Sequence, residues 1–464
     1  MSALEGNELR EKFQANMIQL FTEKKEAEEV HCASLQIAPD QHVLHLFHQL
    51  KSQTDELFRG GGPSCPLHRW SASHVTVMAQ HITRVPYKDG RTQSSAVPMA
   101  SGLDPHLLKM DFLHTSGVLI IQHLQRDYRA YYDFLNFVSD VGDPRNIFSV
   151  YFPLWFQLNQ TIGTKMIWVA TIGDWFNLIF KWILFGHRPY WWIQETQIYP
   201  NHSSPCLEQF PTTCETGPGS PSGQAMGSSC VWYVTVTAAL SFTVSLLEKS
   251  SVTRHRLAWS FLWSVFWLIQ ISVCISRVFI ATHFPHQVIL GVIGGMLVAE
   301  AFEHTPGIHM ASLNMYLKTN IFLFLFALGF YLLLRLLDID LLWSVPIAKK
   351  WCANPDWIHM DSTPFAGLVR NLGVLFGLGF AINSKMFLMS CRGENGCRPS
   401  FRLLCAVTSL TTLQLYHFIK IPTHTEPLFY LLSFCKSASI PLTVVALFPY
   451  GVHMLMRARE KKIK

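Results

Sequence analysis

Long apolar runs constrain this chain more than any other feature of its sequence. Crossing the ~30 Å hydrocarbon core of a bilayer takes about 18 or more apolar residues in a helix. Eight clear runs approach or exceed that length: Met166–Leu184, Val231–Leu247, Leu257–Ile275, Val288–Ala301, Ile321–Leu337, Phe365–Ile382, Leu403–Ile419 and Leu428–Val452. A weaker ninth run, Ile147–Leu158, could borrow from Tyr131–Val138. A soluble helical protein would need charged faces that these segments lack. The sequence therefore predicts an all-α polytopic membrane bundle with eight or nine spans.

Composition excludes several classes of function. Only 15% of the 464 residues are charged, whereas an average soluble domain carries roughly a quarter. The net charge of +6 is modest, and no basic cluster is interleaved with aromatic residues, so we expect no nucleic-acid partner. The eleven cysteines show no metal-ligand spacing, and we expect no metal. Cys206 and Cys214 share one loop and are a candidate disulfide pair.

Basic residues predict which side of the membrane each loop occupies. They gather in alternate loops and in the tail, which the positive-inside rule places in the cytosol: Lys249, Arg254, Arg256, Lys385, Arg392, Arg398, Arg402, Arg457 and Arg459. The final Lys461–Lys464 matches a dilysine signal for the endoplasmic reticulum. Asn201 opens a glycosylation sequon on the opposite, luminal side, whereas the sequon at Asn159 lies at the other edge and is expected to be unused.

The first 109 residues differ from the remainder. Asn7–His31 could form an amphipathic helix, and Gly60–Pro105 is rich in Gly, Pro, Ser and Gln, which predicts disorder. We divide the chain into a hydrophilic extension, residues 1–109, and a membrane domain, residues 110–464, with Met110 as an alternative start. Nine spans would place the extension in the lumen and eight in the cytosol, and the sequence leaves this open.

Three separated segments carry the residues of a phosphate-transfer site: Lys181–Pro189, Gly219–Gln224 and Ser276–His283. Lys181 and two arginines, Arg188 and Arg277, suit the oxygens of a phosphoryl group. His283 can attack phosphorus as a nucleophile. Counting spans from the C-terminus places all three segments on the luminal side, so we expect them to meet in one pocket.

Spacing suggests how the cations are held. Lys181 and Arg188 are seven residues apart, so on a continued helix they would share a face. The alternative is that both merely reach towards lipid headgroups. Asp174 lies seven residues earlier on the same stripe and either neutralises the cations or pairs with a neighbouring span.

The small-residue turn and the histidine complete the pattern. The turn at Gly217–Gly223 precedes an apolar run, so its backbone N–H groups, those of Ser222 and Gly223 in particular, could bind an anion at a helix N-terminus. An ordinary loop is the alternative. Gln287, or else a backbone carbonyl, could hold His283 in the attacking tautomer.

These motifs resemble those of the type 2 phosphatidic acid phosphatase and vanadium haloperoxidase superfamily. The surrounding sequence, including Trp175–Trp192, Gln209–Ser222 and His283–Gly291, is similar to the glucose-6-phosphatase catalytic subunits, and most similar to their islet-specific branch. The resemblance covers residues 110–464; we find no counterpart for the extension.

The resemblance implies an endoplasmic-reticulum membrane enzyme with nine spans, a luminal site, a haloperoxidase-type phosphatase core and no cofactor. By it, Arg188, Arg277 and Lys181 bind phosphate, His283 forms a phosphohistidine that water hydrolyses, and Asn201 falls where the family is glycosylated. Glucose 6-phosphate is the implied substrate, in gluconeogenesis and glucose homeostasis. Membrane lipid and a glucose 6-phosphate transporter are the implied partners.

One position departs from the family. Gln224 stands where the family places the histidine that protonates the leaving sugar oxygen, and an amide has no titratable proton to give. General acid catalysis contributes about 10²–10⁴-fold, so we expect weakened hydrolysis or a silent sugar-phosphate-binding pseudoenzyme. A transporter would need two repeated halves with broken helices, which the sequence lacks. A lipid-phosphate phosphatase shares the core but not the flanking similarity.

Overall fold

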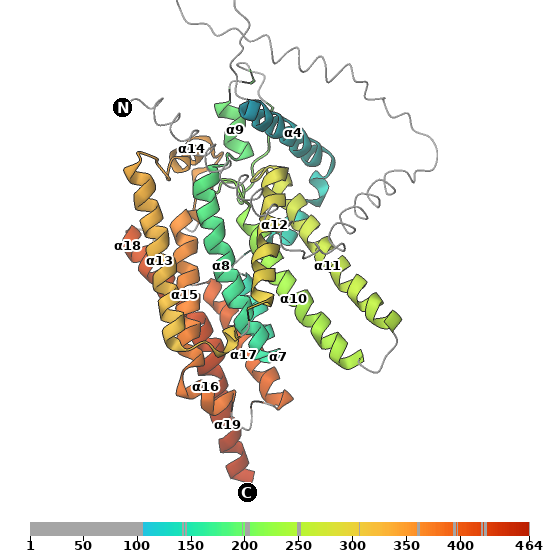
Figure 1. The fold of residues 1–464 in the computed structure, drawn as a ribbon, viewed down its shortest axis with the longest axis vertical. Helices are drawn as coiled ribbons and strands as arrows, with labels where there is room; N and C mark the ends of the chain where they lie inside the picture. Colours follow the sequence, from blue (N-terminus) through green and yellow to red (C-terminus); the bar gives the residue numbers. More distant parts are fainter. Residues whose placement is uncertain are drawn as a thin grey trace, which may run out of the picture. The chain divides into compact units, whose positions relative to one another are not determined.

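A computed structural model gives the arrangement of the chain (Figure 1). It describes residues 105–463 except for residues 142, 144–145, 197, 200–204, 248–251, 306, 360–361, 393–395, 397, 419–420 and 422–424. The expected structure of residues 1–104, the Asn201 sequon and the last lysine fall outside the described residues. Helices account for nearly all regular structure in the described part, where no strand occurs, which confirms the all-α prediction.

The helices run along the chain with short connections. Their bounds are α4 Pro105–Asp127, η1 Arg129–Tyr131, α5 Tyr132–Val141, η2 Ile147–Tyr151, α7 Phe152–Leu158, α8 Gln160–Leu184, α9 Pro189–Glu195, α10 Gly223–Leu247, α11 Val252–Phe279, α12 Pro285–Glu303, η3 Ile308–Met310, α13 Leu313–Leu336, α14 Ser344–Trp351, η4 Pro355–Trp357, α15 Pro364–Ile382, α16 Lys385–Ser390, α17 Pro399–His417, α18 Glu426–Pro441, η7 Leu442–Leu447 and α19 Phe448–Ile463. Helix α4 begins at Pro105, so it continues through Met110 and across the predicted domain boundary.

Seven segments of the described chain are long and apolar enough to cross a membrane: Gln160–Glu195, Gly223–Thr243, Thr253–Phe279, Pro285–Glu303, Leu313–Leu336, Phe365–Ile382 and Glu426–Arg459. Two predicted spans are not among them. Ile147–Leu158 is helical but too short. Residues 403–419 lie largely in α17, where Arg402 and Gln414 dilute the apolar residues. A polytopic helical membrane bundle is therefore confirmed, while the count of nine spans stays a prediction.

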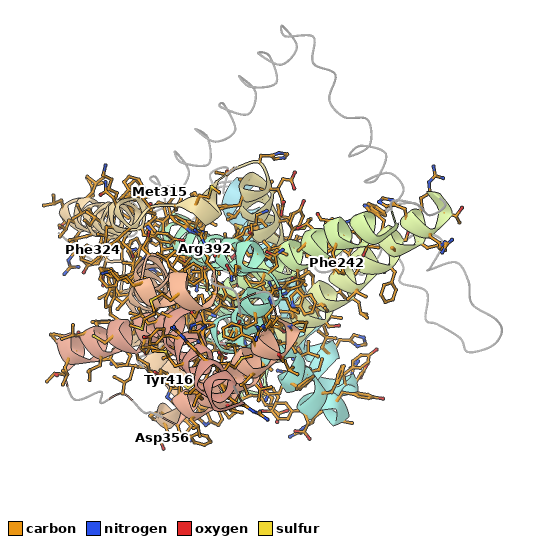
Figure 2. The ribbon with its side chains drawn as sticks, turned by 90° about the horizontal axis from the view of Figure 1, so that it is seen from below. Phe242, Met315, Phe324, Asp356, Arg392 and Tyr416 are labelled. Carbon is orange, nitrogen blue, oxygen red and sulfur yellow. A yellow bond between two sulfur atoms is a disulfide. The ribbon has the colours of Figure 1, made fainter. Side chains whose placement is uncertain are left out.

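Helix α8 is central to the packing. It contacts α7, α10, α12 and α15, and α15 in turn packs against α13 and α18 (Figure 1). Apolar side chains on the periphery point outwards, as Phe242 of α10 and Phe324 of α13 show (Figure 2). Outward-facing apolar residues are what a bilayer requires, because lipid replaces water around the helices.

Candidate active site

The end of α8 sets the position of the first site segment. Phe185 adopts a left-handed conformation, with φ of 47°, and its N–H donates to the carbonyl of Lys181 at 3.3 Å. A left-handed residue terminates an α-helix. Arg188 is therefore in extended backbone before α9 rather than on a continuation of α8. The expectation that Lys181 and Arg188 share one helical face is wrong, because the helix ends between them.

Glycines let the first two segments touch. The N–H of Gly219 donates to the carbonyl of Gly186 at 2.7 Å. A Cβ at Gly219 would lie 2.6 Å from the carbonyl oxygen of His187, and a Cβ at Gly186 would lie 2.5 Å from the Cβ of Ser220. Both distances are too short for a side chain, so these glycines are required for the close approach of the backbones.

Arg188 is fully buried and fixes the geometry of the pocket. Its guanidinium donates to the carbonyls of Gly217 at 2.7 Å, Pro218 at 3.2 Å and Thr282 at 3.2 Å. One terminal nitrogen also lies 3.4 Å from Nε2 of His283. Arg188 thus joins the first and third segments to the turn Gly217–Gly223, which runs into the second.

His283 is held by a backbone carbonyl. Its Nδ1 lies 2.8 Å from the oxygen of Gly219. Because a carbonyl only accepts, Nδ1 carries the ring hydrogen and Nε2 presents its lone pair. Burial lowers the pKa of His283 well below its usual range, and the charge of Arg188 lowers it further, so the imidazole is neutral. A neutral ring whose Nε2 carries a lone pair, here facing Arg188, has the form of a nucleophile.

Gln287 does not orient His283. Its amide nitrogen donates to the carbonyl of His187 at 2.7 Å, and its amide oxygen accepts from the N–H of Phe284 at 3.1 Å. Its own carbonyl accepts from the N–H of Ser222 at 3.0 Å. Gln287 therefore ties the segments together. The backbone N–H of Ser222, expected to bind an anion, is engaged with Gln287 in this arrangement, while Gly223 begins α10.

A carboxylate that the sequence analysis did not single out lies between the two arginines. Glu215 accepts from Arg277 at 2.5 Å and from Arg188 at 2.9 Å, and one of its oxygens is 4.0 Å from Nε2 of His283. Both arginine side chains are almost wholly buried, whereas that of Glu215 is 27% exposed. Burial alone would raise the pKa of Glu215, but the surrounding positive charges hold it well below its usual range. The pocket therefore holds a negatively charged group directly beside the neutral histidine.

Two ionisable residues of α8, Lys181 and Asp174, interact with the charges of this pocket or with each other. Lys181 is within electrostatic reach of Arg188, Glu215 and Asp174. Asp174 accepts a hydrogen bond from the amide of Asn371 on α15. The structure bears out the pairing of Asp174 with a neighbouring helix, and Asp174 also interacts with the charge of Lys181.

Gln224 lies in the first turn of α10, at the edge of the pocket. Its amide oxygen is 3.5 Å from the hydroxyl of Ser139, which belongs to α5 and also accepts from Arg277 at 3.1 Å. Asn177 of α8 supports the same turn by donating to the carbonyl of Pro221 at 3.2 Å. Sequence reasoning missed Glu215, Ser139 and Asn177. Glu215 alone carried a signal, as the one acidic residue between Gln209 and Gln224.

A disulfide fixes the loop that carries Glu215. The bond joins Cys214 to Cys352, which follows α14, and Cys206 is free and exposed. The candidate pairing of Cys206 with Cys214 is therefore wrong. Further contacts reinforce the bridge: Ser344 donates to the carbonyl of Thr216 at 2.8 Å, on the other side of Glu215.

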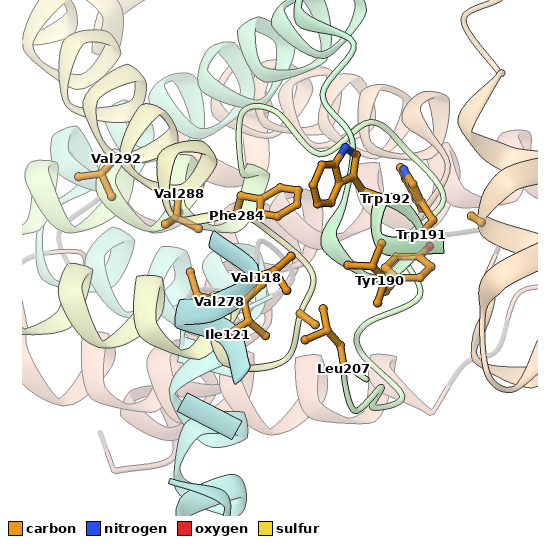
Figure 3. Packing of buried hydrophobic residues seen from close by; sticks show 14 residues of the cluster. Val118, Ile121, Tyr190, Trp191, Trp192, Leu207, Val278, Phe284, Val288 and Val292 are labelled. Carbon is orange, nitrogen blue, oxygen red and sulfur yellow. The ribbon is translucent and has the colours of Figure 1, made fainter. Parts of the chain in front are cut away.

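Apolar packing supports the segment around α9. Trp192 meets Phe284 edge-on, with ring centroids 5.8 Å apart, in a buried cluster that includes Val118 of α4 (Figure 3). His114 of α4 stacks on Phe284 with its centroid 4.5 Å away. The residues on either side of Arg188 and His283 are thus fixed by a rigid aromatic core.

Other predicted features lie away from the pocket. Asn159 is the N-cap of α8, and its side-chain oxygen accepts from the N–H groups of Thr161 and Ile162. Within the described parts of the chain, no group of three or more His, Cys, Asp or Glu residues could hold a metal ion.

Comparison with known proteins decides the family. The sequence model of the PAP2 superfamily matches residues 148–307, which contain all three site segments. The chain is 88% identical to mouse (Mus musculus) glucose-6-phosphatase 2 over 355 residues, which are 76% of this chain and all of that protein. The chain belongs to the glucose-6-phosphatase family. Human (Homo sapiens) glucose-6-phosphatase 2 is 84% identical over 76% of this chain and 99% of its own length.

The second branch of the glucose-6-phosphatase family is more distant. Mouse glucose-6-phosphatase catalytic subunit 1 is 50% identical over 353 residues, covering 76% of this chain and 98% of that protein. No solved structure matches the chain. The expected family and its islet-type branch are therefore confirmed, and the phosphatase assignment rests on sequence relatives together with the arrangement of the pocket.

Proposed function

We propose that this protein hydrolyses glucose 6-phosphate to glucose and phosphate through a phosphohistidine on His283. The observation that carries the proposal is the double clamp on Glu215: two buried arginines hold one anion 4.0 Å from the nucleophilic nitrogen. The choice of glucose 6-phosphate as the substrate rests on the names of the relatives, which are glucose-6-phosphatases.

Substrate binding begins with charge. The dianionic phosphoryl group takes the position of the Glu215 carboxylate between Arg188 and Arg277, and Lys181 adds a third positive charge. Arginines bind phosphate through paired charge-assisted hydrogen bonds, which orient it as well as attract it. The displaced Glu215 side chain has room to turn outwards because it is partly exposed.

The chemical step uses the lone pair on Nε2 of His283. It forms a bond to phosphorus while the bond from phosphorus to the sugar oxygen breaks. The carbonyl of Gly219 accepts a hydrogen bond from Nδ1–H and stabilises the positive charge that develops on the ring. Water then attacks the phosphohistidine, which releases phosphate and restores the neutral histidine.

Departure of the sugar is the weak step. The leaving oxygen needs a proton, and Gln224, at the family's donor position, holds none at neutral pH. An amide N–H can stabilise the developing charge by a hydrogen bond but cannot transfer a proton. We therefore propose turnover reduced by up to the 10²–10⁴-fold of a general acid. Gln224 also supports the second candidate, a pseudoenzyme that binds the sugar phosphate without turning it over.

Location and partners follow from the family and from charge. We propose the endoplasmic-reticulum membrane, a luminal pocket, a glycan at Asn201, a cytosolic dilysine tail and a glucose 6-phosphate transporter as the source of substrate. The hydrophilic extension, residues 1–109, is proposed to be dispensable, although a start at Met110 would remove the first turn of α4.

The experiment compares two leaving groups. Membranes containing the parent chain, Gln224→His or Gln224→Asn are assayed with glucose 6-phosphate and with p-nitrophenyl phosphate, whose leaving group departs unprotonated. We expect Gln224→His to raise kcat on the sugar phosphate about 10²–10⁴-fold, with a much smaller gain on the aryl ester. Gln224→Asn is the matched control, because it changes the side chain but adds no proton that can be transferred to the leaving group. If the parent chain already has the same kcat on glucose 6-phosphate as Gln224→His, the assignment of position 224 as the proton-donor position is wrong.

A further inference from the structure

Ser139 lies between a phosphate-binding arginine and the residue at the proton-donor position. Its hydroxyl is 3.1 Å from a terminal nitrogen of Arg277 and 3.5 Å from the amide oxygen of Gln224. Ser139 itself is only 3% exposed. It comes from α5, outside the three segments that carry the motifs of the site.

Hydrogen-bond chemistry fixes the direction of the Arg277 contact, and the orientation of the Gln224 amide fixes that of the other. A guanidinium only donates, so the Ser139 oxygen must accept from Arg277. Its single O–H remains for the oxygen of Gln224. With that oxygen engaged, the NH₂ of Gln224 is directed away from Ser139. The serine thus determines which end of the amide is available to the pocket.

Helix α5 is held in place by consecutive residues of α11. The Ser276 hydroxyl donates to the carbonyl of Leu135 at 2.6 Å, and the next residue, Arg277, donates to Ser139. Leu135 also packs in a buried cluster with Phe279 and Phe210. Ser139 is therefore on a rigid support, which a residue that positions another side chain needs.

We infer that Ser139 is a positioning residue that orients the side chain at position 224 towards the leaving group. The inference rests on the proposed function and deepens it. With a histidine at position 224, the same hydroxyl can donate to a bare ring nitrogen or rotate to accept from a ring N–H. In either case Ser139 holds the side chain that must face the departing oxygen.

The test measures Ser139→Ala in three backgrounds: Gln224, Gln224→Ala and Gln224→His. The probe is vanadate, a five-coordinate mimic of the transferring phosphoryl group, bound to the full-length protein in membranes. We expect Ser139→Ala to weaken vanadate about threefold to tenfold with Gln224 present, the size of one lost hydrogen bond. With Gln224→Ala only the smaller effect transmitted through Arg277 should remain. Ser139→Thr keeps a hydroxyl and should restore binding.

Turnover gives a second readout. In the Gln224→His background, Ser139→Ala should lower kcat on glucose 6-phosphate by a similar factor, with a smaller loss on p-nitrophenyl phosphate. An equal loss in all three backgrounds, or an equal loss on both substrates, would mean that Ser139 acts only through Arg277 and would overturn the inference. If Gln224→His gains no sugar hydrolysis while the vanadate coupling is present, the proposed function fails and the positioning role stands.

Discussion

The two halves of the described membrane domain bury different kinds of polar side chain. From α4 to α12 the buried set includes the charged or titratable groups Arg188, Arg277 and His283. From α13 to α19, within the described residues, the buried polar side chains are all neutral: Asn320, Ser344, Asn371, Ser390, Ser409, Ser433, Ser437 and Thr443. A buried charge is costly unless it is paired, and it marks a functional site when it is retained inside a membrane protein.

This difference shows how the work is divided between the halves. The superfamily match at residues 148–307 lies within the first half. The second half is connected to the elements of the site at two main points. Asn371 donates a hydrogen bond to Asp174, and Cys352 forms a disulfide with Cys214. In the proposed mechanism the first half supplies the reacting groups, and the second half supports the elements that carry them.

The largest effect should come from His283→Ala. Hydrolysis of both glucose 6-phosphate and p-nitrophenyl phosphate should fall to background, because no other group replaces the nucleophile. The control in the second half is Ser433→Ala, since that buried hydroxyl has no hydrogen-bond partner in the described part of the chain. Its kcat should change less than about twofold. A comparable loss of kcat in His283→Ala and Ser433→Ala would show that the reacting groups are not confined to the first half.

Glu215→Gln should have two opposite effects. Removing the anion leaves two buried arginines uncompensated, which should lower the free energy of unfolding by up to about 3–5 kcal/mol. Inorganic phosphate no longer competes with the carboxylate, so it should bind roughly tenfold more tightly, a change of 1.4 kcal/mol. Thermal unfolding with and without phosphate measures both. Weaker phosphate binding would show that Glu215 helps to hold the phosphate rather than standing in its place.

The pH dependence provides the check on Glu215. Its pKa is depressed in the folded protein, so its stabilisation is fully present above the unfolded value of about 4.3 and is lost as the pH falls towards the folded value. The difference in melting temperature between the parent and Glu215→Gln should therefore be constant at neutral pH and shrink below about pH 4.3. A difference that grows on acidification would mean that the carboxylate is not ion-paired.

The smallest effect is expected from Cys352→Ser, which breaks a contact from the second half. It should raise KM for glucose 6-phosphate by about twofold to tenfold with little change in kcat, because it loosens the loop of Glu215 but removes no reacting group. Thiol labelling of the parent should modify Cys206 without reduction, and Cys214 only after reduction or in Cys352→Ser. Cys206→Ser is the matched control. Labelling of unreduced Cys214 in the parent would disprove the bridge.

Local patterns in the sequence predicted much of the fold and the site. Apolar run length anticipated most of the helices, and motif spacing with loop parity brought Arg188, Arg277 and His283 together. The predicted role of Gln287 was wrong because its polar groups form hydrogen bonds with His187, Phe284 and Ser222 instead of His283. These partners could not be identified from the sequence.

Long-range contacts account for what was missed. Ser139 is an ordinary serine in a weak helical segment, and only its packing against α11 places it beside Arg277. Cys352 lies 138 residues from its partner, so proximity in sequence pointed to Cys206 instead. Both contacts depend on tertiary structure that no local pattern encodes.

The separation of those two cysteines has a consequence for how the protein is made. Cys214 and all the predicted site residues leave the ribosome before Cys352, with helices α10 to α14 synthesised in between. A message cut short after α12 would encode His283, Lys181, Arg188 and Arg277, yet not the cysteine that fastens the loop of Glu215. Completion of the pocket therefore belongs to the last third of translation, and a truncated product would carry the reactive groups without the means to lock them in place.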